Sequence, residues 1–317
     1  MAHLRTLFLF HTGSYNSSGT LNDSVWRKYP WDYVHTVLLY SPHPELTAHA
    51  RSVGANVALS LGAPKDLENG TARQAIIQTA IHNCAGANGC NSLNLDVERS
   101  IANGSVASRL LTTFATELSV AAAARNWSVF FDAAARPGYE GRNYDYRGLN
   151  DAGVNYFFAM DYDLNDYDDP PPDNDGSLAN SPAPVVERGL RALLAAGVPP
   201  SKLIVGLPFY AYEYRGFLGK RPLTSRQRGL HEISSELRDA SWSRLFDNAS
   251  QTPYLSRGSG LAKQQLWYDD PPSIATKTAA ARALGLSLSG CWTADALDYS
   301  GDAPVAADAY WAALRIS

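Results

Sequence analysis

The sequence predicts an α/β protein, and within that class a (β/α)8 TIM barrel with an insertion after its seventh strand. Short apolar segments alternate with Ala- and Leu-rich segments of helical spacing along most of the 317 residues, as expected for parallel strands covered by helices. Eight apolar segments separated by seven crossovers favour a closed barrel over an open sheet. The length also suits one barrel of about 250 residues plus a modest insertion.

Each apolar segment is brief and apolar on both faces, as in a strand buried between a barrel interior and an outer helix layer. The predicted strands are Leu4–Phe10, Val34–Tyr40, Asn56–Leu61, Ser92–Val97, Ser128–Ala133, Tyr156–Asp161, Leu203–Phe209 and Leu288–Trp292. The clearest predicted helices are Thr71–Asn83, Val106–Arg125 and Pro184–Ala196. A doubly wound sheet is the main competitor, but His11-Thr12-Gly13-Ser14, after the first strand, is not its Gly-rich phosphate turn. We therefore expect a single domain over residues 1–317.

Two long segments interrupt this alternation, and each follows the carboxyl end of a predicted strand. Residues 161–182 are an acidic, Pro-rich loop after the sixth strand. The insertion covers about 210–262, with a helical piece expected near Glu232–Leu245, and a hairpin strand at Gln264–Tyr268 follows it. Barrel enzymes carry their catalytic groups on this face, so we expect the functional site there.

Composition and charge exclude several classes of function. The net charge is −4 and no basic stripe is present, which argues against a nucleic-acid partner. No run of about 18 apolar residues predicts a membrane span. No Cys/His set has the spacing of a zinc site, and the acidic loop lacks the Gly and terminal Glu of a calcium loop. We therefore expect no metal and no cofactor.

Cysteines and glycosylation sequons point to the secretory pathway. Cys84 and Cys90 flank a Gly- and Asn-rich turn and are predicted to form a disulfide, whereas Cys291 is expected as a buried thiol on a strand. Six Asn-x-Ser/Thr sequons occur, at Asn16, Asn22, Asn69, Asn103, Asn126 and Asn248. These features predict a glycoprotein that is lysosomal or secreted.

The most informative segment is residues 91–98, Asn-Ser-Leu-Asn-Leu-Asp-Val-Glu. Its alternation places Asn94, Asp96 and Glu98 on one face of a strand, and in a barrel that face points inward. Burying two carboxylates costs several kcal/mol per ion unless they are paired, hydrogen-bonded or protonated. Repulsion between Asp96 and Glu98 favours retention of a proton by the pair, which predicts an acid catalyst. The alternatives are a solvated edge strand and a cation site.

The same segment resembles the signature Asp-Gly-x-Asp-x-Asp-x-Glu of family 18 glycoside hydrolases, with Asn91, Ser92 and Asn94 in place of the first Asp, the Gly and the second Asp. Residues 160–163, Met-Asp-Tyr-Asp, are similar to the family's Met-x-Tyr-Asp after the sixth strand. Residues 207–214, 265–271 and 290–302 narrow the resemblance to the branch of lysosomal di-N-acetylchitobiases, and Asn at position 94 also fits that branch.

The resemblance implies a role for each site residue. Glu98 would be the proton donor, and Asp96 would hold the 2-acetamido group of the substrate, whose oxygen attacks the anomeric carbon in place of an enzyme carboxylate. Tyr162 would donate a hydrogen bond to that acetamido group, Asp163 would contact the sugar, and Trp292 would form the floor beneath it. The remaining candidates for substrate binding are Asn94, Met160, Tyr210, Tyr212, Trp267 and Asp132. Packing is the alternative for Tyr210, Tyr212 and Trp267, and buried support of the acid for Asp132.

We therefore predict a retaining glycoside hydrolase, expected to be a monomer, that cleaves β1,4 bonds between N-acetylglucosamine residues. Its expected substrates are the reducing ends of chitooligosaccharides or of free N-glycan cores. The alternatives are a broader chitinase, an endo-N-acetylglucosaminidase, or a non-catalytic chitin-binding lectin on the same fold. Because Asn94 replaces an Asp, we also expect Asp96 to lack an anionic neighbour on its inner side and to stay ionised over a wider pH range.

Overall fold

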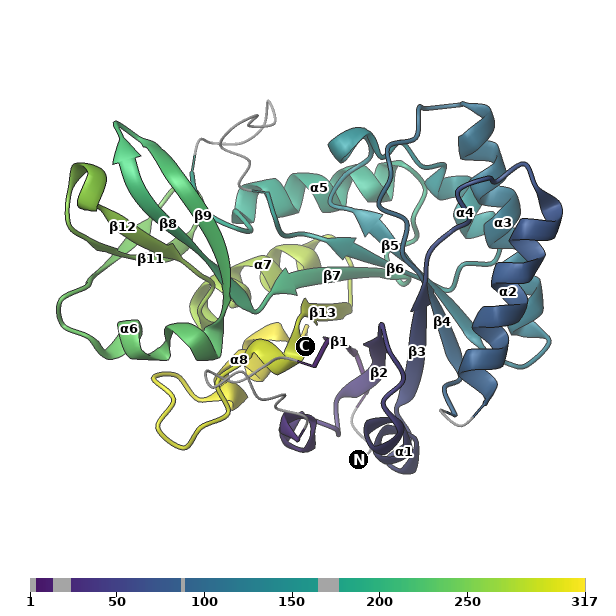
Figure 1. The fold of residues 1–317 in the computed structure, drawn as a ribbon, viewed down its shortest axis with the longest axis horizontal. Coiled ribbons are helices and arrows are strands. Elements are labelled where there is room, and N and C mark those ends of the chain that lie inside the picture. The colour runs from purple at the N-terminus through teal and green to yellow at the C-terminus, as the bar shows by residue number, and fades with distance from the viewer. Residues whose placement is uncertain (1–3, 14–23, 87–88, 165–176, 317) are drawn as a thin grey trace.

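The computed structural model describes residues 4–13, 24–86, 89–164 and 177–316. Eight parallel strands close into a barrel in the order β1-β13-β7-β6-β5-β4-β3-β2, and helices cover its outside (Figure 1). The strands are β1 (Leu7–His11), β2 (Val34–Leu39), β3 (Asn56–Leu61), β4 (Ser92–Leu95), β5 (Ser128–Ala134), β6 (Tyr156–Met160), β7 (Leu203–Pro208) and β13 (Leu288–Trp292). The predicted fold class is confirmed.

The outer layer consists of helices that mostly connect consecutive strands. They are α1 (Pro44–Ser52), α2 (Gly70–Ala85), α3 (Val106–Ala123), α4 (Tyr146–Asp151), α5 (Ala183–Ala195), α7 (Pro271–Ala283) and α8 (Ala307–Leu314), with short 3-10 turns η1 (Val25–Lys28), η2 (Tyr139–Gly141) and η5 (Ala294–Ala296). Side chains satisfy free backbone donors where helices begin: Asn69 accepts from Ala72 N at the start of α2, and Ser105 from Ser108 N at the start of α3. The three helices predicted from sequence correspond to α2, α3 and α5.

Aromatic side chains fill the barrel interior, which fixes where small residues are needed. Phe8, Phe10 and Phe158 are buried there, from β1 and β6. A Cβ at Gly206 in β7 would lie 2.3 Å from the Phe158 ring, and one at Gly290 in β13 would lie 2.6 Å from it. These two glycines therefore make room for the ring. The interior is a packed core.

A second sheet is inserted between β7 and β13. Its strands are antiparallel in the order β10-β11-β12-β8-β9, and it lies beside the barrel, on the left in Figure 1. It comprises β8 (Tyr210–Leu218), β9 (Arg221–Gly229), β10 (Ser243–Asp247), β11 (Thr252–Arg257) and β12 (Gln264–Trp267), with η3 (Leu230–Ile233), α6 (Ser234–Arg238) and η4 (Gly260–Ala262) between strands. The strand predicted at Gln264–Tyr268 corresponds to β12.

The helix predicted near Glu232–Leu245 is wrong for most of its length. Helical structure there is confined to η3 and α6, and the chain then forms strand β10. Asp239 accepts hydrogen bonds from the backbone N and hydroxyl of Ser241, which favours a turn after α6. β10 pairs antiparallel with β11, so Leu245 lies opposite Tyr254. Pairing with the next strand in a hairpin has overridden the local helical pattern.

Several sequence features can be placed directly on this fold. Cys84 and Cys90 form the predicted disulfide, and Cys291 is a free, buried thiol in β13, as predicted. Four sequon asparagines are exposed, Asn69, Asn103, Asn126 and Asn248, whereas Asn16 and Asn22 lie outside the described residues. Within the described ranges no helix is long and apolar enough to cross a bilayer. The same part of the chain holds no group of three or more His, Cys, Asp or Glu that could bind a metal ion.

Candidate active site

Functional side chains gather at the mouth of the barrel because parallel strands deliver their carboxyl ends to the same rim. Strand β4 ends at Leu95, so the strand predicted over Ser92–Val97 is too long. The next residue still continues the ladder, since Asp96 N donates to Leu61 O at 2.9 Å. The chain then leaves the sheet, and the side chain of Glu98 is 52% exposed at the mouth.

Asp96 is a half-satisfied carboxylate. Its Oδ2 accepts a hydrogen bond from the Tyr40 hydroxyl at 2.9 Å, while its Oδ1 is buried and has no partner among the described residues. Burial is the first cause that raises the pKa of Asp96, and the charge of Glu98 is the second, while the Tyr40 hydrogen bond and Arg142 act in the opposite direction. Asp96 and Glu98 therefore interact, as the sequence spacing predicted.

Asn94 and Asp132 form the floor beneath this pair. Both are fully buried, and Asn94 Nδ2 donates to Asp132 Oδ2 at 2.8 Å and to Ser60 Oγ at 3.0 Å. The pKa of Asp132 is raised well above its usual value, first by burial and then by the charge of Asp96. The expectation that Asp96 has no anionic neighbour on its inner side is therefore wrong, because the charge of the buried Asp132 on β5 interacts with that of Asp96.

Glu98 is engaged by a cation that the sequence analysis did not single out. Its Oε2 lies 2.9 Å from Arg142 Nη2, and the same nitrogen lies 2.5 Å from Glu140 Oε2. Behind Glu98, the Tyr144 hydroxyl donates to Val97 O at 2.5 Å. These contacts fix the segment after β4 against the loop after β5.

Aromatic rings form the opposite wall of the mouth. The Trp292 ring, at the end of β13, lies 6.2 Å from the Tyr162 ring in a stacked arrangement, 5.6 Å from Tyr40 and 5.1 Å from Phe10. Burial is the main cause that raises the pKa of Tyr162 well above its usual value, followed by the charge of Asp132. The Tyr162 hydroxyl therefore keeps its proton and can act as a hydrogen-bond donor.

Asp163 accepts several side-chain hydrogen bonds, in contrast to Asp96. Its Oδ1 accepts hydrogen bonds from the Tyr210 hydroxyl at 2.5 Å, the Tyr212 hydroxyl at 2.7 Å and Gln227 Nε2 at 3.2 Å. Its backbone N donates to Asn180 Oδ1 at 2.7 Å, and its φ of 57° lies in the left-handed region. Through these contacts Asp163 joins the end of β6 to strands β8 and β9 of the inserted sheet.

Two of the predicted substrate-binding residues, Met160 and Trp267, pack in hydrophobic clusters. Met160 is the last residue of β6, two positions before Tyr162, and packs at the edge of the barrel's interior core. Trp267 is buried within the inserted sheet, its ring stacked on Tyr254 with centroids 4.3 Å apart. Its Nε1 donates to Gln265 Oε1 at 3.1 Å, so Trp267 is a core residue of that sheet rather than a cleft wall.

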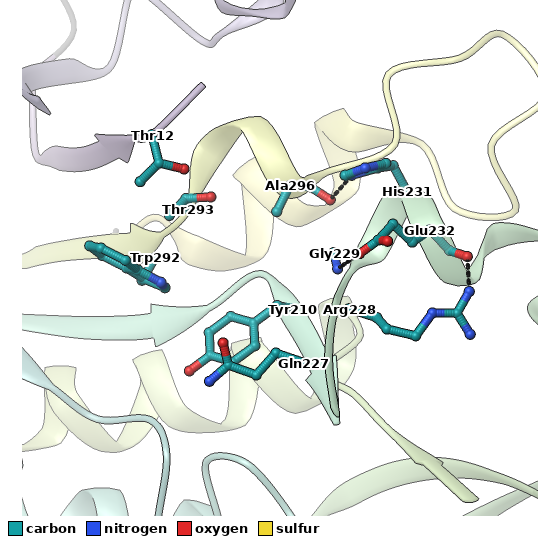
Figure 2. A pocket seen from close by; sticks show the side chains of 10 residues that line it. All are labelled: Thr12, Tyr210, Gln227, Arg228, Gly229, His231, Glu232, Trp292, Thr293 and Ala296. Carbon is teal, nitrogen blue, oxygen red and sulfur yellow. Dashed lines mark hydrogen bonds between the residues drawn. The ribbon is translucent and has the colours of Figure 1, made fainter. Parts of the chain in front are cut away.

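A pocket of about 320 Å³ adjoins the aromatic wall where the barrel meets the inserted sheet. Figure 2 shows Trp292 and Tyr210 on one side of it and His231 and Glu232 on the other, with Thr293 and Ala296 from the segment after β13. The volume lies at the lower end of the range for small-molecule sites. Because Glu98 follows β4, across the barrel from β13, the pocket extends the site away from the acid.

Tyr40, Arg142 and Gln227 contact the predicted site residues but were missed from sequence. Tyr40 ends a predicted strand, so its place at the carboxyl rim was an available signal. Arg142 and Gln227 reach the site from a loop and from the inserted sheet, and no local pattern marks them.

Comparisons with known proteins agree with this geometry. The sequence profile of Glycosyl hydrolases family 18 matches residues 7–296. The chain is similar to the di-N-acetylchitobiase of Rattus norvegicus, at 28% identity over 93% of this chain and 86% of the relative. It is also similar to that of Homo sapiens, at 27% identity over 89% and 78% of the two chains.

Solved structures show the same fold at low identity. The Group IV chitinase of Ostrinia furnacalis superposes with a TM-score of 0.78 at 15% identity, over 98% of this chain and 99% of that one. The class V chitinase of Nicotiana tobaccum, in complex with NAG4, superposes with a TM-score of 0.73 at 16% identity, over 96% and 99% of the two chains.

Proposed function

The chain belongs to family 18 of the glycosyl hydrolases, and we propose that it cleaves the β1,4 bond between N-acetylglucosamine residues at the reducing end of chitooligosaccharides or free N-glycan cores. The observation that carries this proposal is the meeting of Asp96, Glu98 and Tyr162 with Trp292 at one barrel mouth. The sequence similarity to the di-N-acetylchitobiases of rat and human supports this substrate class.

The mechanism follows from what each group offers. Glu98, exposed at the mouth, protonates the departing glycosidic oxygen. Asp96 binds the N–H of the 2-acetamido group, and Tyr162 donates a hydrogen bond to its carbonyl oxygen. That oxygen attacks the anomeric carbon as the C–O bond breaks, so the configuration is retained after water reopens the intermediate. The Trp292 ring supports the apolar face of the same sugar.

The pocket beyond Trp292 gives a second sugar a place to bind. It lies on the side of Trp292 away from Glu98, so its occupant belongs to the part of the substrate that keeps the anomeric carbon. Arg228 at its edge is held by Glu236, with Nη1 2.6 Å from Glu236 Oε1. A wall of fixed polar groups orients a ligand at low entropic cost, which favours substrates longer than a single sugar unit.

The test is hydrolysis of N,N'-diacetylchitobiose, longer chitooligosaccharides and a free N-glycan, with separation of the products by chromatography. We expect Glu98→Gln to lower kcat by about 10²- to 10⁴-fold without lowering the melting temperature, because the side chain is half exposed. Glu187→Gln, which removes an exposed carboxylate on α5, is the matched control.

Each outcome distinguishes between candidate functions. Release of one reducing-end sugar at a time supports the chitobiase-type reaction, whereas internal cleavage products indicate a broader chitinase or an endo-N-acetylglucosaminidase. Binding of chitooligosaccharides without turnover by the unmodified protein indicates a lectin. Equal activity of Glu98→Gln and the unmodified protein removes Glu98 from the mechanism.

We also propose that the protein is a glycoprotein of the secretory pathway, lysosomal or secreted, and a monomer. The disulfide between Cys84 and Cys90 and the exposure of Asn69, Asn103 and Asn126 support the first proposal. Mass spectrometry before and after enzymatic removal of N-glycans tests it, and an unchanged mass contradicts it. Light scattering tests the oligomeric state.

A further inference from the structure

Arg142 lies between two carboxylates at the mouth of the barrel. Its Nη2 is 2.9 Å from Glu98 Oε2 and 2.5 Å from Glu140 Oε2. The Arg142 side chain is only 11% exposed, whereas those of Glu98 and Glu140 are 52% and 51% exposed. A nearly buried guanidinium is costly without a charge partner. The two carboxylates beside it supply that partner.

The backbone fixes this arrangement. Ile101, three residues after Glu98, pairs with Arg142 in a parallel bridge, and its N donates to Gly141 O at 2.9 Å. Gly141 has a φ of 73°, and a Cβ there would lie 2.3 Å from Ser100 Oγ, so only glycine permits this close approach. The loop after β5 thus carries Arg142 to the acid in a defined position.

We propose that Arg142 and Glu140 act together as positioning residues for the acid. Glu140 balances the charge of Arg142 while Glu98 carries its proton. When that proton leaves, Arg142 pairs with the Glu98 carboxylate. The inference rests on the proposed function. Without Glu140, Arg142 would hold Glu98 as an anion and oppose protonation. Without Arg142, the anion formed in the chemical step would lose its partner.

The charges balance through the step. The O–H bond of Glu98 breaks while an O–H bond forms on the departing glycosidic oxygen, whose bond to the anomeric carbon breaks. The negative charge then left on Glu98 faces Arg142 Nη2, which lies 2.9 Å from Glu98 Oε2. A preorganised cation next to a developing anion lowers the free energy of the transition state in which that charge develops.

Other groups also face Glu98 and must be held constant. Asp96 precedes it, Asp132 reaches it from β5, Tyr40 from the end of β2, and Tyr144 from the segment after η2, and each interacts electrostatically with it. All four are unchanged in the variants below. Differences between variants therefore report on Arg142 and Glu140.

The test is the pH dependence of kcat/KM for Arg142→Gln and Glu140→Gln. Removing the cation moves the basic limb to higher pH, and removing the competing anion moves it to lower pH, each by roughly one pH unit. A structural role alone would lower activity in both variants without moving the limbs in opposite directions. Arg142→Lys keeps the charge and should leave the limb close to its original position, and Glu187→Gln on α5 is the distant control.

A second measurement does not depend on turnover. Carbon-13 NMR titration of the labelled Glu98 carboxyl, in protein without substrate, should show the same two opposite shifts. Shifts in one direction, or none, overturn the inference even where hydrolysis is normal. Absence of hydrolysis by the unmodified protein overturns the proposed function while leaving the titration interpretable. If Arg142→Gln fails to fold, the comparison of Glu140→Gln with Arg142→Lys still tests the direction of the pH shift.

Discussion

Asp96 and Asp163 lie at the same barrel mouth but are held in opposite ways. Asp163 accepts three side-chain hydrogen bonds on one oxygen, whereas Asp96 accepts one and leaves a buried oxygen without a partner among the described residues. The three donors fix the position of the Asp163 side chain. Asp96 has a single side-chain donor, and burial raises its pKa.

This difference assigns separate tasks to the two sides of the mouth. The Asp163 side joins the barrel to the inserted sheet and sets the shape of the site. The side built from β4 and β5 carries Asp96, Asp132 and Glu98. Burial raises the pKa of Asp96 and Asp132, and repulsion from neighbouring carboxylates raises it further. The Asp163 side therefore holds the shape of the site, and the side that carries Glu98 is the one proposed to transfer the proton. Four substitutions, ordered from the largest expected effect on activity to the smallest, and one control within the inserted sheet test this division.

Asp96→Asn should have the largest effect on activity. The amide can still accept from Tyr40 but lacks the negative charge that stabilises the acetamido group during attack, so kcat should fall about 10²- to 10³-fold. Thermal unfolding should show no loss of stability at neutral pH, because the substitution removes a largely desolvated charge. Activity within a few-fold of the unmodified protein would show that Asp96 does not act in the reaction.

Asp163→Ala should damage both shape and stability. It removes the shared acceptor of Tyr210, Tyr212 and Gln227 and places Ala at a φ of 57°, which together should cost about 2–4 kcal/mol of unfolding free energy. KM should rise roughly tenfold, since the loss of about 1.4 kcal/mol of binding corresponds to that factor. Urea unfolding and steady-state kinetics measure the two effects.

Trp267→Phe is the control for this prediction within the inserted sheet. It weakens the stack on Tyr254 and should lower stability by about 1 kcal/mol while leaving KM unchanged. If KM instead rose as it does for Asp163→Ala, Trp267 would belong to the cleft, and its assignment to the core of the sheet would be in error.

Tyr40→Phe should change the pH profile more than the maximal rate. The Tyr40 hydrogen bond lowers the pKa of Asp96, so its removal raises that pKa and moves the acid limb of kcat/KM to higher pH, by about one unit or less. The rate at the optimum should fall by less than about tenfold. If the acid limb stays in place or moves to lower pH, the ionisation of Asp96 does not determine that limb.

Asp132→Asn should have the smallest effect on activity and a pH-dependent effect on stability. Because the pKa of Asp132 is raised in the folded state, its contribution to stability is present below about pH 4 and is lost as pH rises through the folded value. The Asn variant does not titrate, so at pH 7 it should be more stable than the unmodified protein. The gain should vanish near pH 4, and an equal gain at both pH values would contradict this account.

Much of the fold and part of the site could be predicted from local pattern. Apolar segments of strand length gave the barrel, because burial on both faces leaves the same signature wherever the strand lies. Spacing alone predicted that Asp96 and Glu98 interact, since neighbouring positions of equal parity point the same way at the end of a strand. The disulfide between Cys84 and Cys90 was equally local, with five residues between them.

Tertiary structure decided the rest, because these features depend on partners that the pattern of a single segment does not reveal. Residues 243–247 became a strand only through pairing with β11, and Trp267 became a core residue only because Tyr254 covers its ring. Arg142 reaches Glu98 across 44 positions of sequence. A local pattern records which face of a segment is buried, but charge, pKa and access to solvent depend on the partner that the closed barrel brings there.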